Sequence, residues 1–297
     1  MSAPTVSRSE GQLRRALSAL RRDPLALTGT AVLVLLVVVG VAGPWLAPAG
    51  INDVDVDRML QAPSWAHPFG TDELGRDVLS RVMVAARVSL QVGAVSVGIA
   101  LVAGVTLGLF AGYYRGWVDN LLMRCMDVLF AFPVLLLAVA IVAVLGPGLL
   151  TAMIAIGVVY TPIFARVTRA GVLSVREQVF VRAAVSIGAS DLRIMRRHVL
   201  PNIAAPLIVQ TSLSLAFAIL SEAALSFLGL GVQPPAPAWG RMLYDGRGFV
   251  TDAWWLGVFP GAAIFVTVLA FNLVGDALRD VLDPRQLTVN EARRSTG

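Results

Sequence analysis

Six long apolar runs, separated by shorter polar segments, constrain this chain more than any other feature of its sequence. A hydrocarbon core of about 30 Å is crossed by about 20 mostly apolar residues in a helix. Lipid offers no partner to backbone polar groups, so such runs cross as helices. The sequence therefore predicts an all-α polytopic membrane protein with six transmembrane helices, near residues 25–47, 88–112, 121–146, 149–168, 203–228 and 254–276.

Composition supports this prediction, because 57% of the residues are hydrophobic and only 14% are charged. A soluble domain of that composition would expose a large apolar surface. We interpret the first run as an uncleaved anchor, because it is longer than the apolar region of a signal peptide. The predicted parts are a tail at 1–24, a first helix at 25–47, an extracytoplasmic segment at 48–87, a core at 88–276 and a tail at 277–297.

The arginines predict how the chain is oriented. All 24 basic residues are arginine, and positively charged loops resist translocation. With both termini in the cytoplasm, only six arginines fall in outer segments. The other 18 fall in cytoplasmic segments: five in 1–24, two in 113–124, seven in 166–200 and four in 277–297. The net charge of +5 then reflects topology, and we expect no nucleic-acid partner.

Several function classes are excluded by missing residue types. The chain has no lysine, so it has neither a phosphate-binding loop nor a Schiff-base lysine. Cys125, His67 and His198 are too few and too distant to form a Cys/His metal cage. No closely spaced Ser/His/Asp set is visible, although triad partners can lie far apart in sequence. We therefore expect a non-catalytic subunit that binds no cofactor or metal.

Small residues and one carboxylate stand out within the apolar runs. Ser96, Ala100, Gly104, Gly108 and Gly112 recur every four residues, which indicates close packing of two helices. Glu222 lies near the outer end of the fifth run. An intramembrane carboxylate indicates a functional role, so Glu222 either lines a polar passage or snorkels outward.

Two segments outside the spans are too rich in turn formers to be plain connectors. Residues 67–81 predict turns followed by a short helix near the membrane surface. Residues 227–240 predict a fixed non-helical loop, with tryptophan anchoring it at the headgroup level. Either segment is compatible with a rigid cap. The second is also a candidate gate element, and its gate candidates are Gly229, Gly231, Gln233, Pro234, Pro235 and Trp239.

The basic segment 182–202 predicts a docking surface in the cytoplasm. It holds two short helical patterns separated by Gly188, with Ser190 as the cap of the second helix. Leu192, Met195 and Val199 are predicted to share one face of that helix, and Arg193, Arg196 and Arg197 flank it.

The spacing within this segment carries a family resemblance. The family motif is Glu-Ala-Ala, a spacer of three residues, Gly, a spacer of nine residues, an apolar residue, a spacer of one residue, and Leu-Pro. In this sequence the motif positions are occupied by Arg182, Ala183, Ala184, Gly188, His198, Leu200 and Pro201. Arg182 replaces the usual Glu, and His198 replaces the usual Ile. Residues 70–77, 228–240 and 254–285 carry the same resemblance. The chain resembles the C-type permease subunit of dipeptide and oligopeptide importers, in the peptide/nickel branch of ATP-binding-cassette (ABC) importers.

The resemblance implies a type I ABC importer permease fold in a bacterial inner membrane. It implies a homologous B-type partner permease, one or two ATPase subunits that bind ATP and Mg²⁺, and an extracytoplasmic substrate-binding protein. Glu222 is then expected at the interface with the partner permease. The ATPase-coupling residues, within a loop at 169–202, are Arg182, Ala183, Ala184, Gly188, Ser190, Asp191, Leu192, Met195, Leu200 and Pro201.

The cargo implied by the resemblance is a di- or oligopeptide, with a nickel chelate or a haem-like compound as alternatives. A secondary transporter driven by an ion gradient, with Glu222 as its coupling carboxylate, is the alternative from another class. The absence of two matching inverted-repeat halves counts against it.

Overall fold

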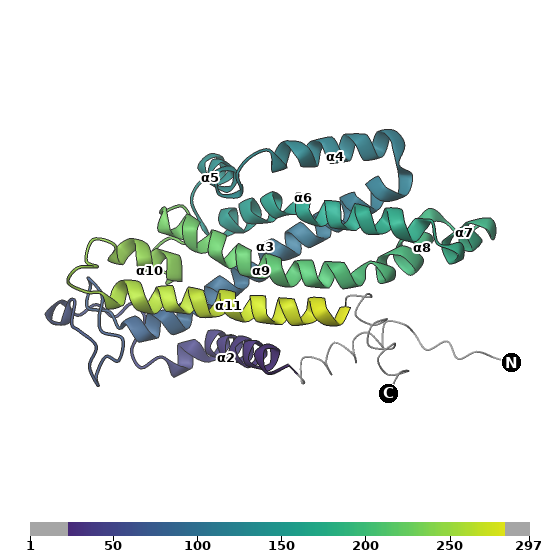
Figure 1. Ribbon diagram of the computed structural model, residues 1–297. Coiled ribbons are helices and arrows are strands. Elements are labelled where there is room, and N and C mark those ends of the chain that lie inside the picture. Colours follow the sequence, from purple (N-terminus) through teal and green to yellow (C-terminus); the bar gives the residue numbers. More distant parts are fainter. Residues whose placement is uncertain (1–22, 283–297) are drawn as a thin grey trace, which may run out of the picture.

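The computed structural model describes residues 23–282, and these residues form an elongated bundle of helices (Figure 1). The expected tails fall mainly outside this range, as does the prediction that both termini are cytoplasmic. The α-helices are α2 (Pro24–Leu46), α3 (Val78–Tyr114), α4 (Gly116–Phe130), α5 (Val134–Leu145), α6 (Leu149–Arg176), α7 (Val179–Ser186), α8 (Asp191–Ile194), α9 (Ala204–Phe227), α10 (Trp239–Gly246) and α11 (Trp255–Leu282).

Five of these helices, α2, α3, α6, α9 and α11, are long and apolar enough to cross a membrane. A sixth span is reached if α4 and α5 count as one, although they meet at 92°. The third predicted span, near 121–146, is therefore bent and divided into two helices. Pro133 explains the bend, because it lacks an N–H and disfavours helical geometry at Phe132 before it.

The second span begins at Val78, well before the predicted residue 88. Asp77 starts it: the Asp77 carboxylate accepts hydrogen bonds from the backbone N–H and the hydroxyl of Ser80, at 2.8 and 2.7 Å. Residues 78–81 are thus the first turn of α3, and the separate short helix predicted there is wrong. The single helix α3 runs from one end of the bundle to the other (Figure 1).

The glycine stripe of α3 packs against α6 inside the chain, as its spacing predicts. A Cβ added to Gly104 would lie 2.5 Å from the Phe164 Cβ, and one added to Gly112 would lie 2.7 Å from the Val172 Cβ. At these positions only glycine allows the observed helix separation.

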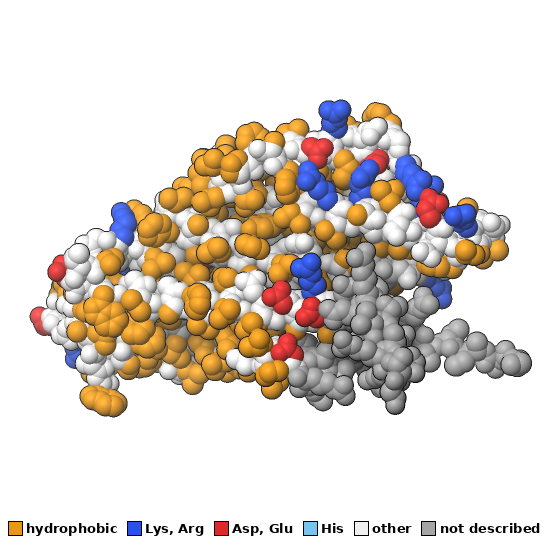
Figure 2. Space-filling view, in the orientation of Figure 1, with side chains coloured by type: hydrophobic (Ala, Val, Ile, Leu, Met, Phe, Trp, Pro, Cys, Tyr) orange, Lys and Arg blue, Asp and Glu red, His pale blue; other side chains and the backbone are white. Residues whose placement is uncertain are grey.

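The two ends of the bundle differ in construction. Residues 177–202, with α7 and α8, project from one end; α10 and the segment 47–77 cover the other (Figure 1). Figure 2 shows apolar side chains over the middle of the visible face and charged side chains gathered toward the α7–α8 end. This distribution fits a bundle surrounded by lipid at its middle.

We expect Gly108→Leu to destabilise the bundle, because a Cβ at Gly108 would lie 2.5 Å from the Ala165 carbonyl oxygen and 2.6 Å from the Thr168 Cβ. Overpacking of this kind costs about 1–3 kcal/mol. Thermal unfolding of the detergent-solubilised chain measures the loss. Gly98→Leu is the control, because a Cβ there meets nothing within 4 Å on the same helix; equal unfolding temperatures for the two variants would contradict the packing argument.

Candidate functional site

The segment between α6 and α9 begins with the short helix α7, which ends in a left-handed turn at Gly188. Gly188 has φ +78°, a conformation that disfavours residues with a Cβ. The N–H of Gly188 donates to the Val185 carbonyl at 2.9 Å, and the N–H of Ala189 donates to the Ala184 carbonyl at 3.1 Å. The predicted helix–Gly–helix arrangement is therefore present.

The second half of the segment is not one regular helix. After α8, residues Met195–Val199 form a π-helical turn, in which the Leu200 N–H donates to the Met195 carbonyl. Pro201 follows, and it has no N–H with which to continue an α-helical ladder. Met195 and Val199, at the two ends of this turn, are both buried.

Two sequence predictions for this helix are wrong. Leu192 does not share the buried face, and its side chain is 59% exposed. The prediction assumed a regular helical period, which the π turn interrupts. Ser190 occupies the N-cap position of α8, but its side chain makes no capping hydrogen bond.

Polar contacts brace the segment against the rest of the bundle. The Tyr113 hydroxyl at the end of α3 donates to Asp191 Oδ1 at 2.8 Å. Arg115 donates to Glu177 Oε1 at 2.7 Å, and this contact lowers the pKa of Glu177. Arg182, which replaces the Glu of the motif, donates to the Glu177 carbonyl at 2.9 Å. Movement of this segment is thereby tied to movement of α3.

The outer surface of the segment forms a tip that is apolar and cationic together. We call this surface the knob; its exposed apolar members are Val179, Phe180, Val185, Ile187 and Leu192. A shallow groove of about 320 Å³ lies beside Leu192, lined also by Ser190, Arg193, Arg196 and Arg197.

The ten predicted coupling residues divide by exposure. Ala184 and Met195 are buried and hold the segment to the bundle, and Leu200 is half-buried. The exposed remainder is Arg182, Ala183, Gly188, Ser190, Asp191, Leu192 and Pro201.

Glu222 is fully buried within the chain near the α10 end. Its Oε1 accepts a hydrogen bond from the Ser226 hydroxyl at 2.7 Å, and Oε2 has no partner among residues 23–282. Both the outward snorkelling and the expected exposure to a partner permease are wrong in this conformation. Close packing of α3 and α10 on α9 covers the carboxyl: Ile219 contacts α3 at Gly93, and Ala223 contacts α10 at Gly240.

Ser226 also fixes the loop that follows α9. Its hydroxyl oxygen accepts the Val232 N–H at 3.1 Å. A Cβ on Gly231 would clash with this hydroxyl, and Gly229 adopts φ +81°. The Gln233 side-chain amide donates to the carbonyls of Gly229 and Gly231 at 3.1 and 3.0 Å. The loop is ordered as predicted, and only residues 233–236, with Pro234 and Pro235, form its exposed apex.

Trp239 does not anchor the loop at the headgroups, as the sequence predicted. It is buried at the first turn of α10, and its Nε1 donates to the Val82 carbonyl of α3 at 3.0 Å. Its anchor is therefore the α3 backbone, because an indole N–H needs an acceptor when it is buried.

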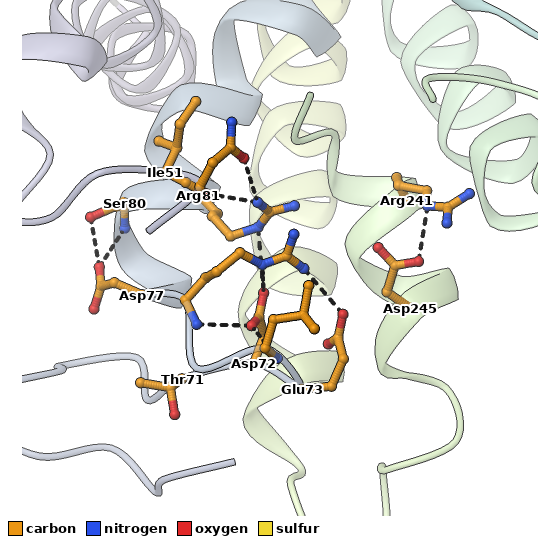
Figure 3. A network of polar contacts seen from close by, with 12 residues as sticks. Ile51, Thr71, Asp72, Glu73, Asp77, Ser80, Arg81, Arg241 and Asp245 are labelled. Atoms are coloured by element: carbon orange, nitrogen blue, oxygen red, sulfur yellow. Dashed lines mark hydrogen bonds and ion pairs between the residues drawn. The ribbon is translucent and has the colours of Figure 1, made fainter. Parts of the chain in front are cut away.

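Sequence reasoning missed a polar network that secures the segment before α3 (Figure 3). Asp72 Oδ2 accepts from Arg76 Nε at 2.7 Å and lies 3.6 Å from Arg81 Nε. Arg81 also donates to the Ile51 carbonyl at 2.8 Å. Burial and the nearby Asp72 raise the pKa of Glu73, which pairs with Arg76 at 3.1 Å. Residues 72–76 form a turn with Gly75 at φ +74°, so no helical spacing signalled this pair.

Family models match most of the chain. The model described as "Binding-protein-dependent transport system inner membrane component" matches residues 104–288. The chain belongs to this family. A second model, described as "N-terminal TM domain of oligopeptide transport permease C", matches residues 11–63. The predicted resemblance to C-type peptide permeases is thereby confirmed.

Curated relatives agree with the family models. The permease is 47% identical to the dipeptide transport system permease protein DppC of Alkalihalophilus pseudofirmus, over 92% of this chain and 90% of that protein. It is 48% identical to the glutathione transport system permease protein GsiD of Escherichia coli O157:H7, over 89% of this chain and 88% of that protein. The chain is thus a permease subunit of an ABC importer.

A solved structure supports the predicted fold. The permease matches a chain of the MetNI methionine ABC transporter, in inward-facing conformations, with a TM-score of 0.55 and 17% identity. The match covers 68% of this chain and 96% of the other. The ABC importer permease fold is therefore confirmed.

We expect Ser226→Ala to loosen the loop after α9, because the Val232 N–H loses its acceptor and Glu222 loses its donor. A lost hydrogen bond of about 1 kcal/mol corresponds to roughly fivefold faster exchange. Hydrogen–deuterium exchange of the backbone amides in residues 229–236 measures this loosening of the loop. Ser221→Ala is the control, since the Ser221 hydroxyl pairs with the Tyr160 hydroxyl instead. Equal exchange in both variants would contradict the role of Ser226 in fixing the loop.

Proposed function

We propose that this permease forms half of the translocation pathway of an ATP-driven importer of peptides, and that the knob couples it to a separate ATPase. The observation that carries the proposal is the knob itself, whose large apolar side chains are exposed yet braced to α3. An exposed apolar patch beyond the lipid-facing middle indicates a protein partner.

Coupling through the knob follows from its construction. Ile187 and Leu192 would be buried in a groove of the ATPase, and the neighbouring arginines would pair with acidic residues there. When the ATPases close on ATP and Mg²⁺ and reopen after hydrolysis, the braced segment would carry a rigid-body movement into α3 and α6. This permease supplies no ATP site, consistent with its lack of lysine.

The proposed assembly needs three further kinds of subunit. A homologous B-type permease completes the pathway, one or two ATPase subunits lie below the knob, and an extracytoplasmic binding protein delivers cargo. The α7–α8 end then faces the cytoplasm of a bacterium, together with both termini, as the arginine distribution indicates.

At the opposite end, the apex at 233–236 is the proposed gate element. Its base is fixed by Ser226 and the α10 end, and its apex is exposed. A pre-ordered loop loses little entropy when the binding protein docks, which suits repeated, transient contact.

Di- and tripeptides are the proposed cargo, because the relatives are named for dipeptide and glutathione transport. A nickel chelate or a haem-like compound is the alternative within the resemblance. The ion-gradient transporter is disfavoured, because the Glu222 carboxyl is enclosed within the chain and has no exposed surface at which to exchange ions.

Transport in reconstituted vesicles tests this function. With the partner permease, ATPases and binding protein present, we expect accumulation of labelled dipeptide or glutathione that requires hydrolysable ATP. A non-hydrolysable ATP analogue is the control and should give none. Accumulation driven by a proton or sodium gradient without ATP would instead establish the secondary transporter.

Gly188→Val tests the coupling role of the knob. Forcing valine to the left-handed φ costs about 1–3 kcal/mol, so we expect ATP hydrolysis to become uncoupled from transport. Gly116→Val is matched in strain, because Gly116 has φ +56° and, like Gly188, has nothing within 4 Å of an added Cβ. Gly116 is the first residue of α4, outside the knob. The measurement is cargo transported per ATP hydrolysed; a normal ratio in an assembled Gly188→Val complex would refute the coupling role.

A further inference from the structure

Arg87 lies within the third turn of the long span α3, where it faces the surface of the bundle. It is level with Gly40 of α2, since a Cβ on Gly40 would lie 3.2 Å from the Arg87 Cα. Helix α2 continues six residues beyond Gly40 to Leu46, or about 9 Å at 1.5 Å per residue. The Arg87 backbone is thus inside the apolar zone, within reach of the headgroups for a long side chain.

The described part of the chain offers Arg87 no anion. None of its carboxylates lies within 4.0 Å of the guanidinium, although other arginines are paired. The neighbouring helix α2 contains no charged residue. An unpaired arginine costs about 2.5–3.5 kcal/mol at the centre of a span, and less near its ends. The cation therefore needs an anion from outside this chain.

Arg87 lines a groove of about 420 Å³ between α2 and α3. Gln91, one turn along α3, lies beside it as a second hydrogen-bond donor. Val37, Val41 and Ala94 are apolar walls of the same groove, and Trp45 lies toward the end of α2 with 81% of its surface exposed.

The groove presents groups suited to each part of a phospholipid. An exposed tryptophan at the end of a span belongs at the headgroup level. Arg87 and Gln91 are donors suited to phosphate oxygens. The apolar residues beside them, with Ala94 about one turn beyond Gln91, suit an acyl chain. Helix α2 lies at the edge of the bundle, so the groove is accessible from the surroundings (Figure 1).

We propose that the groove between α2 and α3 binds a phospholipid, with its phosphate held by Arg87 and Gln91 and an acyl chain against Val37, Val41 and Ala94. The apolar walls select a lipid over free phosphate. The bound lipid supplies the anion that Arg87 lacks and fills the gap beside α2.

The test uses the whole transporter complex, stripped of lipid and titrated with phosphatidylglycerol in native mass spectrometry. Arg87→Gln is expected to weaken the tightest lipid-binding step about tenfold. Arg124→Gln is the control, because Arg124 is an exposed arginine of α4 outside the groove. Ala94→Trp fills the groove while keeping the charge, and it should also reduce lipid retention.

A photoreactive side chain at position 41 identifies the occupant directly, in complexes that retain Arg87. Crosslinking that adds the mass of a phospholipid supports the proposal. Crosslinking to the partner permease would overturn it by showing that the groove is a protein interface. Equal lipid titrations for the unmodified complex, Arg87→Gln and Ala94→Trp would also overturn it.

Discussion

The close packing of α3 on α6 is the interaction on which the rest of this permease depends. Glycines at 104, 108 and 112 allow the two backbones to approach within the bundle. In lipid the hydrophobic effect contributes little to helix association, so this contact depends on close van der Waals packing. It makes α3 and α6 behave as one rigid unit along most of the span.

Both candidate functional regions are attached to that rigid unit through α3. At one end the Tyr113 hydroxyl donates to Asp191 of the knob. At the other, the Val82 carbonyl accepts the indole N–H of Trp239, at the start of α10. A displacement of the knob therefore has a direct mechanical route to the opposite loop, along one helix and without a chain of small side-chain movements.

Sequence alone predicted the features that depend on local periodicity and residue type. The apolar runs, the glycine stripe and the turn at Gly188 follow from hydrophobicity, spacing and the absence of a side chain. The bend before Pro133 and the π turn before Pro201 were missed, although proline was the visible signal. The sequence predicted the surroundings of Glu222 and Trp239 wrongly. Their burial depends on contacts with helices that are distant in the sequence, and no local sequence pattern records such contacts.

The burial of Glu222 changes what its carboxyl can do. A carboxyl facing a passage would exchange cargo or ions. The Glu222 carboxyl instead accepts a hydrogen bond from the Ser226 hydroxyl, whose oxygen in turn accepts one from the Val232 N–H. A polar pair sealed in an apolar interior favours a single arrangement, because breaking it leaves unpaired groups that cannot reach water. The loop after α9 is consequently fixed to its helix. Any opening at this end must move α9, its loop and α10 together, rather than unfold the loop alone.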